Sequence, residues 1–215
     1  PSMLAVRGEL SVDATGGSFD PSADHPRFPD FQHEVTPARY VSVSTATGPH
    51  LGFLVNHLYH DNNGGKDPLP IHAGVRKHQA QRVVEHLATN VTNVAGVVWA
   101  TDFNQAREAD KNMDDWAVVT SALNAIGQPV DDGVAALLSR HGFACAYDKA
   151  TLNNFGEGSA QGATRAPQLT HWSHTTVDFP YLQSQGAAAF RGVYVIPSVL
   201  SDHLPIVTDI ALTSE

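Results

Sequence analysis

The chain of 215 residues contains a single cysteine and no apolar run of the roughly 18 residues that a helix needs to cross a bilayer. One cysteine cannot form an internal disulfide, so the fold cannot depend on an intramolecular cross-link. Cys145 lies in the apolar stretch 143–147, and we expect it to be a core residue rather than a nucleophile. The composition, 42% hydrophobic, is otherwise that of a soluble globular protein and leaves the compartment open between cytoplasmic and secreted.

Basic charge is also scarce, with 13 Lys and Arg against 22 Asp and Glu and a formal net charge of −9. A protein that grips nucleic acid mainly through its phosphates usually carries a basic stripe, and the sequence shows none. Tight, non-specific nucleic-acid binding is therefore not indicated. A nuclease is not excluded, because a bound divalent cation would change the local field where a phosphate sits.

Strand-like and helix-like segments alternate along the chain. Residues 1–38 are rich in Gly, Pro, Ser and Asp and are predicted to be irregular. Hydrophobic periodicity predicts helices over 75–89, 114–126 and 131–141 and strands over 39–45, 51–58, 94–100, 175–182, 192–196 and 204–212. This pattern predicts a mixed α/β architecture in one domain spanning residues 1–215.

Two of the predicted helices carry clear signals. In 75–89 the apolar residues recur at helical spacing, and Arg76 and Arg82 are predicted to lie on the polar face. In 131–141, Asp131 and Asp132 stand where an N-terminal cap belongs, and Gly142 stands where the helix would stop.

The first segment that could carry chemistry is Thr-Asp-Phe-Asn at 101–104, directly after an apolar run typical of a buried strand. On an extended chain the side chains of Asp102 and Asn104 would share one face, with Phe103 pointing into the core. A carboxylate and an amide oxygen together suit a hard cation, a phosphoryl oxygen or water. The alternative interpretation is a strand end closed by an Asx turn.

Two further segments place acidic and imidazole groups beside apolar strands. Asp202 and His203 are adjacent just before 204–212, so one turn could offer a metal ligand and a general base. Asp178 lies in the apolar segment 175–182, where a buried carboxylate would need a partner such as an imidazole. Each segment alone is also compatible with an ordinary loop or strand-edge residue.

Taken in order, the three segments resemble the signatures of the endonuclease/exonuclease/phosphatase superfamily, which has a DNase-I-like fold. The family's Gly-Asp-Phe-Asn, Ile-Asp-Tyr and Ser-Asp-His-x-Pro segments correspond to Thr-Asp-Phe-Asn at 101–104, Val-Asp-Phe at 177–179 and Ser-Asp-His-Leu-Pro at 201–205. Its Asn-Thr-His-Leu segment resembles Val-Asn-His-Leu at 55–58, and its Arg-x-x-Gln-Ala segment resembles 76–80. The resemblance covers residues 39–212.

The resemblance implies a DNase-I-like four-layer α/β sandwich, with two packed mixed β-sheets flanked by helices. It also implies a hydrolase that cleaves phosphoester bonds by in-line attack of activated water, with Mg²⁺ or Mn²⁺ as cofactor. By this resemblance Asp102 and Asn104 hold the attacking water and a phosphoryl oxygen. Asp202 is expected to be a metal ligand, with Asp102 and Asn104 contributing to the same site.

The imidazoles implied by the resemblance lie on the phosphate side of the reaction centre. His203 would hydrogen-bond the phosphate or act as a base, and Asp178 would orient it. His57 would be a second imidazole on the phosphate. The family's principal metal-binding Glu has no convincing counterpart, because Glu34 lies too close to His57 in the sequence.

The missing Glu leads to the expectation that the N-terminal portion of the fold is reduced or absent. A partner chain that completes the sandwich would then cover an exposed sheet edge. Two functions stay open: an active phosphoester hydrolase, or a catalytically impaired relative that serves as a binding or assembly module. The substrate stays open between nucleic acid, phospholipid and a small phosphomonoester.

Overall fold

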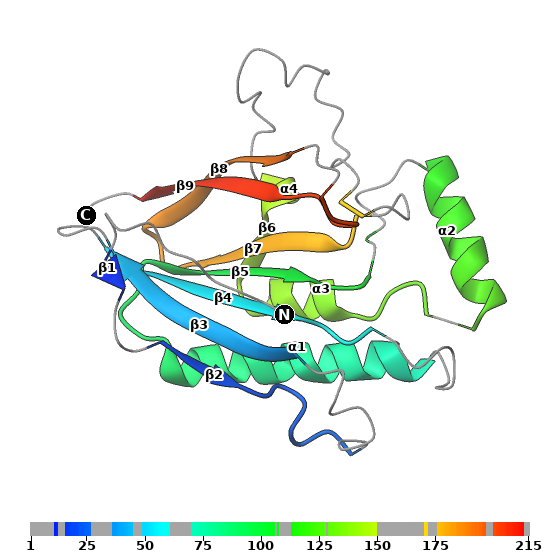
Figure 1. Ribbon diagram of the computed structural model, residues 1–215, viewed down its shortest axis with the longest axis horizontal. Coiled ribbons are helices and arrows are strands. Elements are labelled where there is room, and N and C mark those ends of the chain that lie inside the picture. The colour runs from blue at the N-terminus through cyan, green and yellow to red at the C-terminus, as the bar shows by residue number, and fades with distance from the viewer. Residues whose placement is uncertain are drawn as a thin grey trace, which may run out of the picture.

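The computed structural model describes residues 11–12, 16–26, 36–44, 49–60, 70–105, 107, 113–127, 129–149, 170–171, 176–196 and 200–212. Glu34 falls outside these ranges, so the expectation about this residue is not tested. Figure 1 shows a layered α/β molecule, in which the helix α1 and the hairpin β8–β9 lie on opposite sides of a large sheet.

The large sheet has seven strands in the order β1-β3-β4-β5-β7-β6, with β2 also paired to β3. Its strands are β1 (Ser11–Val12), β2 (Gly17–Phe19), β3 (Thr36–Ser44), β4 (Leu51–His57), β5 (Gly96–Asp102), β6 (Phe143–Cys145) and β7 (Asp178–Ser184). The neighbours β4 and β5 are parallel, whereas the other pairs are antiparallel. The sheet is therefore mixed, as expected.

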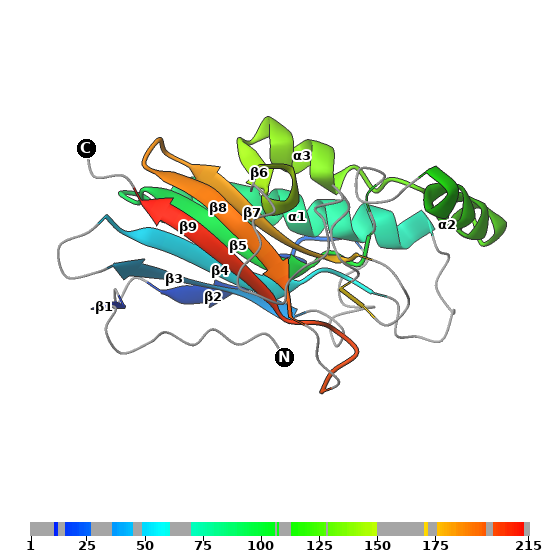
Figure 2. The same cartoon turned by 90° about the horizontal axis from the view of Figure 1, so that it is seen from above.

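The remaining elements are a second sheet and four helices. The second sheet is the antiparallel pair β8 (Ala188–Val195) and β9 (Ile206–Leu212). The helices are α1 (Pro70–Asn90), α2 (Met113–Ala125), α3 (Val134–Arg140) and α4 (Ala146–Lys149). Seen from above, β8 and β9 lie in front of the large sheet, and α1 and α3 lie side by side behind it (Figure 2).

Strand β5 lies in the middle of the large sheet, and apolar side chains cover both of its faces. Val97, Val98 and Trp99 are at most 3% exposed, and they belong to one hydrophobic cluster that extends from α1 to β8. The indole N–H of Trp99 donates to the side-chain oxygen of Asn56 on β4 at 2.8 Å, so even this buried polar group is paired. The apolar run 94–100, predicted to be a strand buried on both faces, forms β5 and is buried on both faces.

All of the strands and helices expected from the sequence are present, with displaced ends. The largest displacement is at α1, which begins at Pro70 rather than at residue 75. Four short elements were not expected: β1, β2, β6 and α4. Such short segments are too short to show a hydrophobic period, and β1, β2 and β6 are defined by their partners in the sheet.

The N-terminal region predicted to be irregular contains β1 and β2. Gly17 pairs with Tyr40 of β3, and a Cβ atom at Gly17 would lie 2.9 Å from the Tyr40 hydroxyl oxygen. The glycine therefore leaves room for the Tyr40 ring beside β2. The prediction that residues 1–215 form one domain stays a prediction, because long stretches of the chain lie outside the described residues.

Helix α1 packs against the sheet through the face predicted to be apolar, but Arg76 does not belong to its polar face. Arg76 is 1% exposed, and its Nε donates to Asp132 Oδ2 at 2.8 Å while its Nη2 donates to Gln105 at 3.0 Å. Periodicity assigned a charged residue to the solvent, but a buried carboxylate partner compensates the charge. Gln79, also buried, accepts from the Tyr59 backbone N–H at 2.8 Å.

The N-cap of α3 is Gly133 rather than Asp131 or Asp132, but both aspartates bind backbone N–H groups at the start of the helix. Asp131 accepts from the backbone N–H of Gly133 at 2.7 Å, and Asp132 accepts from that of Val134 at 3.0 Å. Asp132 thus satisfies a free donor at the first turn of the helix while it binds Arg76. Gly142 ends the helical region with φ of 78°, the left-handed conformation typical of a helix stop.

Cys145 is 1% exposed in β6, so the core assignment of this residue is confirmed. None of the helices in the described part of the chain is both long enough and apolar enough to span a membrane.

We predict that Arg76→Ala lowers the free energy of unfolding by about 3–5 kcal/mol, because it leaves the Asp132 carboxylate buried without its partner. The matched control is Arg82→Ala on the same helix. Arg82 is exposed and pairs with Asp24 and Glu85 at the surface, so its loss should cost at most about 1 kcal/mol. Urea unfolding followed by circular dichroism measures the free energy of unfolding of both variants. Equal losses would contradict the conclusion that Arg76 compensates a buried carboxylate.

Candidate active site

The register of the large sheet aligns three of the predicted site residues. In the parallel pair β4–β5, His57 lies opposite Asp102, and in the antiparallel pair β5–β7, Asp102 lies opposite Asp178. The ends of two parallel strands and the start of an antiparallel one meet at the same sheet edge. His57, Asp102 and Asp178 therefore form one row across three neighbouring strands.

The Asp102 carboxylate faces two imidazoles. Its Oδ2 lies 3.2 Å from His57 Nε2 and 3.6 Å from His203 Nε2. The His57 contact lies within ion-pair distance but lacks hydrogen-bond geometry, because Nε2 has no hydrogen-bond partner in the described part of the chain. The His203 contact is longer than a hydrogen bond. Both ring nitrogens therefore face the carboxylate without being bonded to it.

Asn104 is held in a turn rather than on an extended strand. Its backbone N–H donates to Asp102 Oδ1 at 2.8 Å, and its φ is 53°, in the left-handed region. The prediction that Asp102 and Asn104 share one face of an extended segment is wrong, since β5 ends at Asp102 and an Asx turn follows. The turn still places Asn104 beside the site, where its side-chain amide donates to the Leu58 carbonyl at 2.9 Å.

Phe103 points to the other face, as expected, and is 4% exposed. Its ring packs against Trp99, Phe179 and Tyr181 in the core.

His203 is held by Asp178. Its Nδ1 lies 2.9 Å from Asp178 Oδ2 and 3.2 Å from Oδ1, so Nδ1 donates to the carboxylate and Nε2 is turned toward Asp102. Burial lowers the pKa of His203, but the hydrogen bond and the negative charges of Asp178, Asp102 and Asp202 outweigh it, and the pKa is raised above 6.5. Burial raises the pKa of Asp178, and the nearby Asp102 charge acts in the same direction.

Thr170 connects the two segments that bring Asp178 and His203 together. Its hydroxyl oxygen accepts from the backbone N–H groups of Val177 at 3.1 Å and Asp178 at 3.3 Å, while its carbonyl accepts from Leu204 at 2.8 Å. Thr170 is fully buried. Nothing in its sequence neighbourhood singled it out, because its partners are set by tertiary contacts.

Asp202 lies at the rim of the site, with a side chain that is 63% exposed. Slight desolvation acts to raise its pKa, but hydrogen bonds from its own backbone and from Ser201 lower the pKa below the usual value. The side chain that faces it from another segment is His171, whose Nε2 lies 3.9 Å from Asp202 Oδ2. Sequence analysis did not assign His171 to the site.

Two cavities flank the strand ends. One, of about 250 Å³, lies between β5, β7 and β9 and is lined by Asp102 and Asp178 together with Leu204 and Ile206. A second, of about 330 Å³, lies on the helix side of the sheet.

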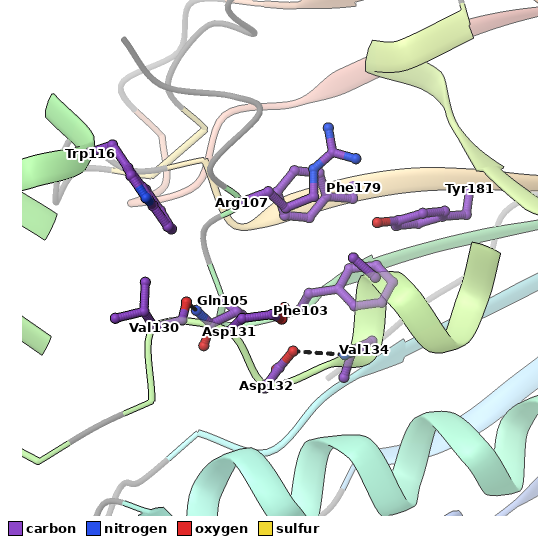
Figure 3. Close-up of a pocket in the computed structure, with 11 residues that line it drawn as sticks. Phe103, Gln105, Arg107, Trp116, Val130, Asp131, Asp132, Val134, Phe179 and Tyr181 are labelled. Atoms are coloured by element: carbon purple, nitrogen blue, oxygen red, sulfur yellow. Dashed lines mark hydrogen bonds between the residues drawn. The ribbon is translucent and has the colours of Figure 1, made fainter. Parts of the chain in front are cut away.

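Figure 3 shows the second cavity, with Trp116 of α2 facing the rings of Phe103 and Phe179 across it. Its polar side chains are engaged: Arg107 pairs with Asp148 at 3.1 Å, and Asp132 binds Arg76. None of the predicted site residues lines it, whereas Asp102 and Asp178 line the smaller cavity.

The residues fit a divalent cation in the chemistry of their donors. Two groups of side chains in the described part of the chain bring three possible ligand atoms within 4.8 Å of one another: Asp102, Asp178 and His203, and His171, Asp202 and His203. No such group contains both Asp102 and Asp202. The predicted ligands Asp102 and Asp202 are therefore close to one shared imidazole rather than to each other.

Solved structures of known proteins resemble this chain, although no family model and no curated protein matches its sequence. The catalytic domain of human nocturnin with bound sulfate is 15% identical with a TM-score of 0.55, over 97% of this chain and 62% of that one. An endonuclease/exonuclease/phosphatase family protein from Bacteroides thetaiotaomicron is 15% identical with a TM-score of 0.55, over 96% of this chain and 68% of that one. D. rerio TDP2 complexed with single-strand DNA product is 14% identical with a TM-score of 0.52, over 94% of this chain and 68% of that one.

At such identities the likeness establishes the fold, which is the DNase-I-like α/β sandwich expected from the sequence. The chain spans 62% of the length of the nocturnin domain and 68% of the other two structures.

We predict that the His203 imidazole of the metal-free protein titrates above 6.5, because Asp178 stabilises its protonated form. Replacing the charge by Asp178→Asn should lower the His203 pKa, while Asp209→Asn on the exposed edge of β9 should not change it. Proton NMR titration of the imidazole resonances in the presence of a chelator measures both. A wild-type pKa at or below 6.5 would contradict the assignment.

Proposed function

We propose that this chain is a member of the endonuclease/exonuclease/phosphatase superfamily and a divalent-cation-dependent hydrolase of phosphoester bonds. The observation that carries the proposal is the row of His57, Asp102 and Asp178, completed by His203 from the turn before β9. Two imidazoles on either side of a carboxylate form a pocket for an anionic group that must also hold a water molecule.

Asp102 is the residue we assign to the attacking water. Its Oδ1 already accepts the Asn104 N–H, whereas Oδ2 faces the two imidazoles without a hydrogen bond to either. A carboxylate oxygen in this position can accept a proton from a water molecule, and a lone pair on the oxygen of that water then attacks phosphorus. Asn104 is held by Leu58 so that its side-chain oxygen remains to bind water or a phosphoryl oxygen.

His203 and His57 supply the groups that contact the phosphate. Because Asp178 occupies Nδ1 of His203, Nε2 is the nitrogen turned toward the reaction centre. With a proton on Nε2 this imidazole donates to a phosphoryl oxygen, and without it the same atom accepts a proton from water. His57 Nε2, buried and unbonded in the described part of the chain, is the second donor.

For the cation, Mg²⁺ or Mn²⁺, we keep the ligands that the family resemblance implies, Asp202, Asp102 and Asn104, although no group of close ligand atoms in the described part of the chain contains both aspartates. When bound, such an ion neutralises the charge that develops on the phosphoryl oxygens. Asp202 presents an exposed carboxylate whose lowered pKa keeps it ionised, as a metal ligand must be.

The comparisons support a phosphoester substrate and do not narrow its class. D. rerio TDP2 carries a DNA product, and nocturnin carries a sulfate anion, which has the shape and charge of a phosphate. The net charge of −9 and the absence of a basic stripe favour a small or flexible phosphoester over tightly gripped duplex DNA.

The proposal is tested by turnover of a phosphodiester, bis(4-nitrophenyl) phosphate, and of a monoester, 4-nitrophenyl phosphate, with Mg²⁺, Mn²⁺ or excess chelator. We expect metal-dependent turnover of at least one. His203→Ala and Asp102→Asn should each lower kcat by about 10²–10⁴-fold, the range typical of a lost acid–base group.

The matched control is His141→Ala, an exposed imidazole at the end of α3, which should leave kcat unchanged. Turnover that persists in chelator, or a His203→Ala protein with wild-type kcat, would overturn the proposal. A chain that neither binds Mg²⁺ or Mn²⁺ nor hydrolyses either substrate would instead be the catalytically impaired relative.

A further inference from the structure

Two imidazoles and a carboxylate gather at the rim of the site, next to the residues assigned to the phosphate. His171 comes from the segment before β7, and Asp202 and His203 come from the turn before β9. One ligand atom of each lies within 4.8 Å of those of the other two. We refer to these three side chains as the rim cluster.

The backbone holds the two imidazoles of the rim cluster together. His171 and His203 form an isolated antiparallel β-bridge, and their ring centroids are 4.6 Å apart. Thr170 strengthens this bridge, since its carbonyl accepts the backbone N–H of Leu204, directly after His203. Main-chain contacts therefore hold the segments of His171 and His203 next to each other.

His203 is prepared to act as a ligand through Nε2. Its Nδ1 donates to the Asp178 carboxylate, which is the arrangement that proteins use to orient a metal-bound histidine. Its Nε2 lies 3.6 Å from Asp102 Oδ2, too far for a hydrogen bond, so Nε2 is not hydrogen-bonded to that carboxylate.

The spacing within the rim cluster suits one ion. His171 Nε2 and Asp202 Oδ2 are 3.9 Å apart, which is too far for a hydrogen bond between them. A cation that binds imidazole nitrogen and carboxylate oxygen at about 2.0–2.2 Å fits between two atoms at this separation. Three protein ligands also leave part of the coordination sphere to water or substrate, as in catalytic sites.

We propose that the rim cluster of His171, Asp202 and His203 binds a single transition-metal ion, in preference to Mg²⁺. Magnesium prefers an octahedral shell of oxygen atoms, whereas two imidazoles and one carboxylate suit Zn²⁺, Co²⁺ and, more weakly, Mn²⁺. This inference deepens the proposed function, because Asp202 is the metal ligand in both. It adds His171 and His203 as ligands and changes the expected metal.

The metal and the proton on His203 are alternatives at one atom. Without the ion, His203 Nε2 can donate a hydrogen bond to a phosphoryl oxygen. With the ion bound, Nε2 must be deprotonated, and the positive charge at this position comes from the cation instead.

The test is a calorimetric titration of the full chain, freed of metal by a chelator and then dialysed, with Zn²⁺, Co²⁺, Mn²⁺ and Mg²⁺. We expect one equivalent of Zn²⁺ or Co²⁺ to bind at least about tenfold more tightly than Mg²⁺. The visible spectrum of bound Co²⁺ provides a second readout, since it reports nitrogen ligation independently of activity.

His171→Phe keeps a ring against His203 and removes only the ligand, so Zn²⁺ and Co²⁺ affinity should fall by at least about tenfold. Asp178→Asn should lower it roughly 10–100-fold, because that carboxylate orients His203. His141→Phe, a matched change at an exposed histidine, should leave the affinity unchanged. If His171→Phe fails to fold by circular dichroism, His171→Asn takes its place.

Unchanged Zn²⁺ affinity in the His171 variant, or Mg²⁺ binding as tightly as Zn²⁺, would overturn the inference. Phosphoester turnover measured on the same proteins separates the two proposals. Turnover that needs Asp202 and is indifferent to His171 would leave the proposed function standing without the rim site. His171-dependent Zn²⁺ binding with no turnover would leave the rim site standing without the proposed function.

Discussion

The pairing of β5 between β4 and β7 sets the positions of His57, Asp102 and Asp178, the row on which the site is built. A shift of one residue in either register would turn Asp102 to the opposite face of the sheet and place Phe103 in its position. Asn56 opposes such a shift, because its side-chain oxygen accepts the Trp99 indole N–H and its carbonyl accepts the Thr101 hydroxyl. Two cross-strand hydrogen bonds, both buried, therefore hold β4 and β5 in the one register that aligns His57 with Asp102.

The helix side of the sheet supports the same edge. Arg76 reaches from α1 to Asp132 at the start of α3 and to Gln105, directly after the Asx turn at Asn104. Gln79 binds the backbone of Tyr59, close to the end of β4. The Arg-x-x-Gln-Ala segment is thus structural in this chain: its two polar side chains bind the loops that follow β4 and β5. The charge of Arg76 is tolerated in the core because Asp132 lies 2.8 Å away.

The electrostatics of the site depend on an imidazole between two carboxylates. Asp178 and Asp102 are each less than one-fifth exposed, and each raises the proton affinity of His203, which lies against both. This arrangement favours the protonated form of His203. The same histidine belongs to both groups of possible metal ligands in the described part of the chain, one with Asp102 and Asp178 and one with His171 and Asp202.

The sequence by itself determined the segments that carry the chemistry. The apolar runs predicted the strands and a mixed α/β architecture. The family resemblance of the motifs at 101–104, 177–179 and 201–205 implied the fold and the proximity of Asp102, Asp178 and His203. The burial of Arg76 on α1 and the placement of His171 beside His203 were decided only by tertiary structure, because each depends on partners distant in sequence. The Asx turn at Asn104 is different: it depends on Asp102, two residues away, and the sequence had left it open as an alternative. A buried charge is compatible with the core only when its counter-charge is in place, and two imidazoles form a ligand pair only when a β-bridge has joined their segments.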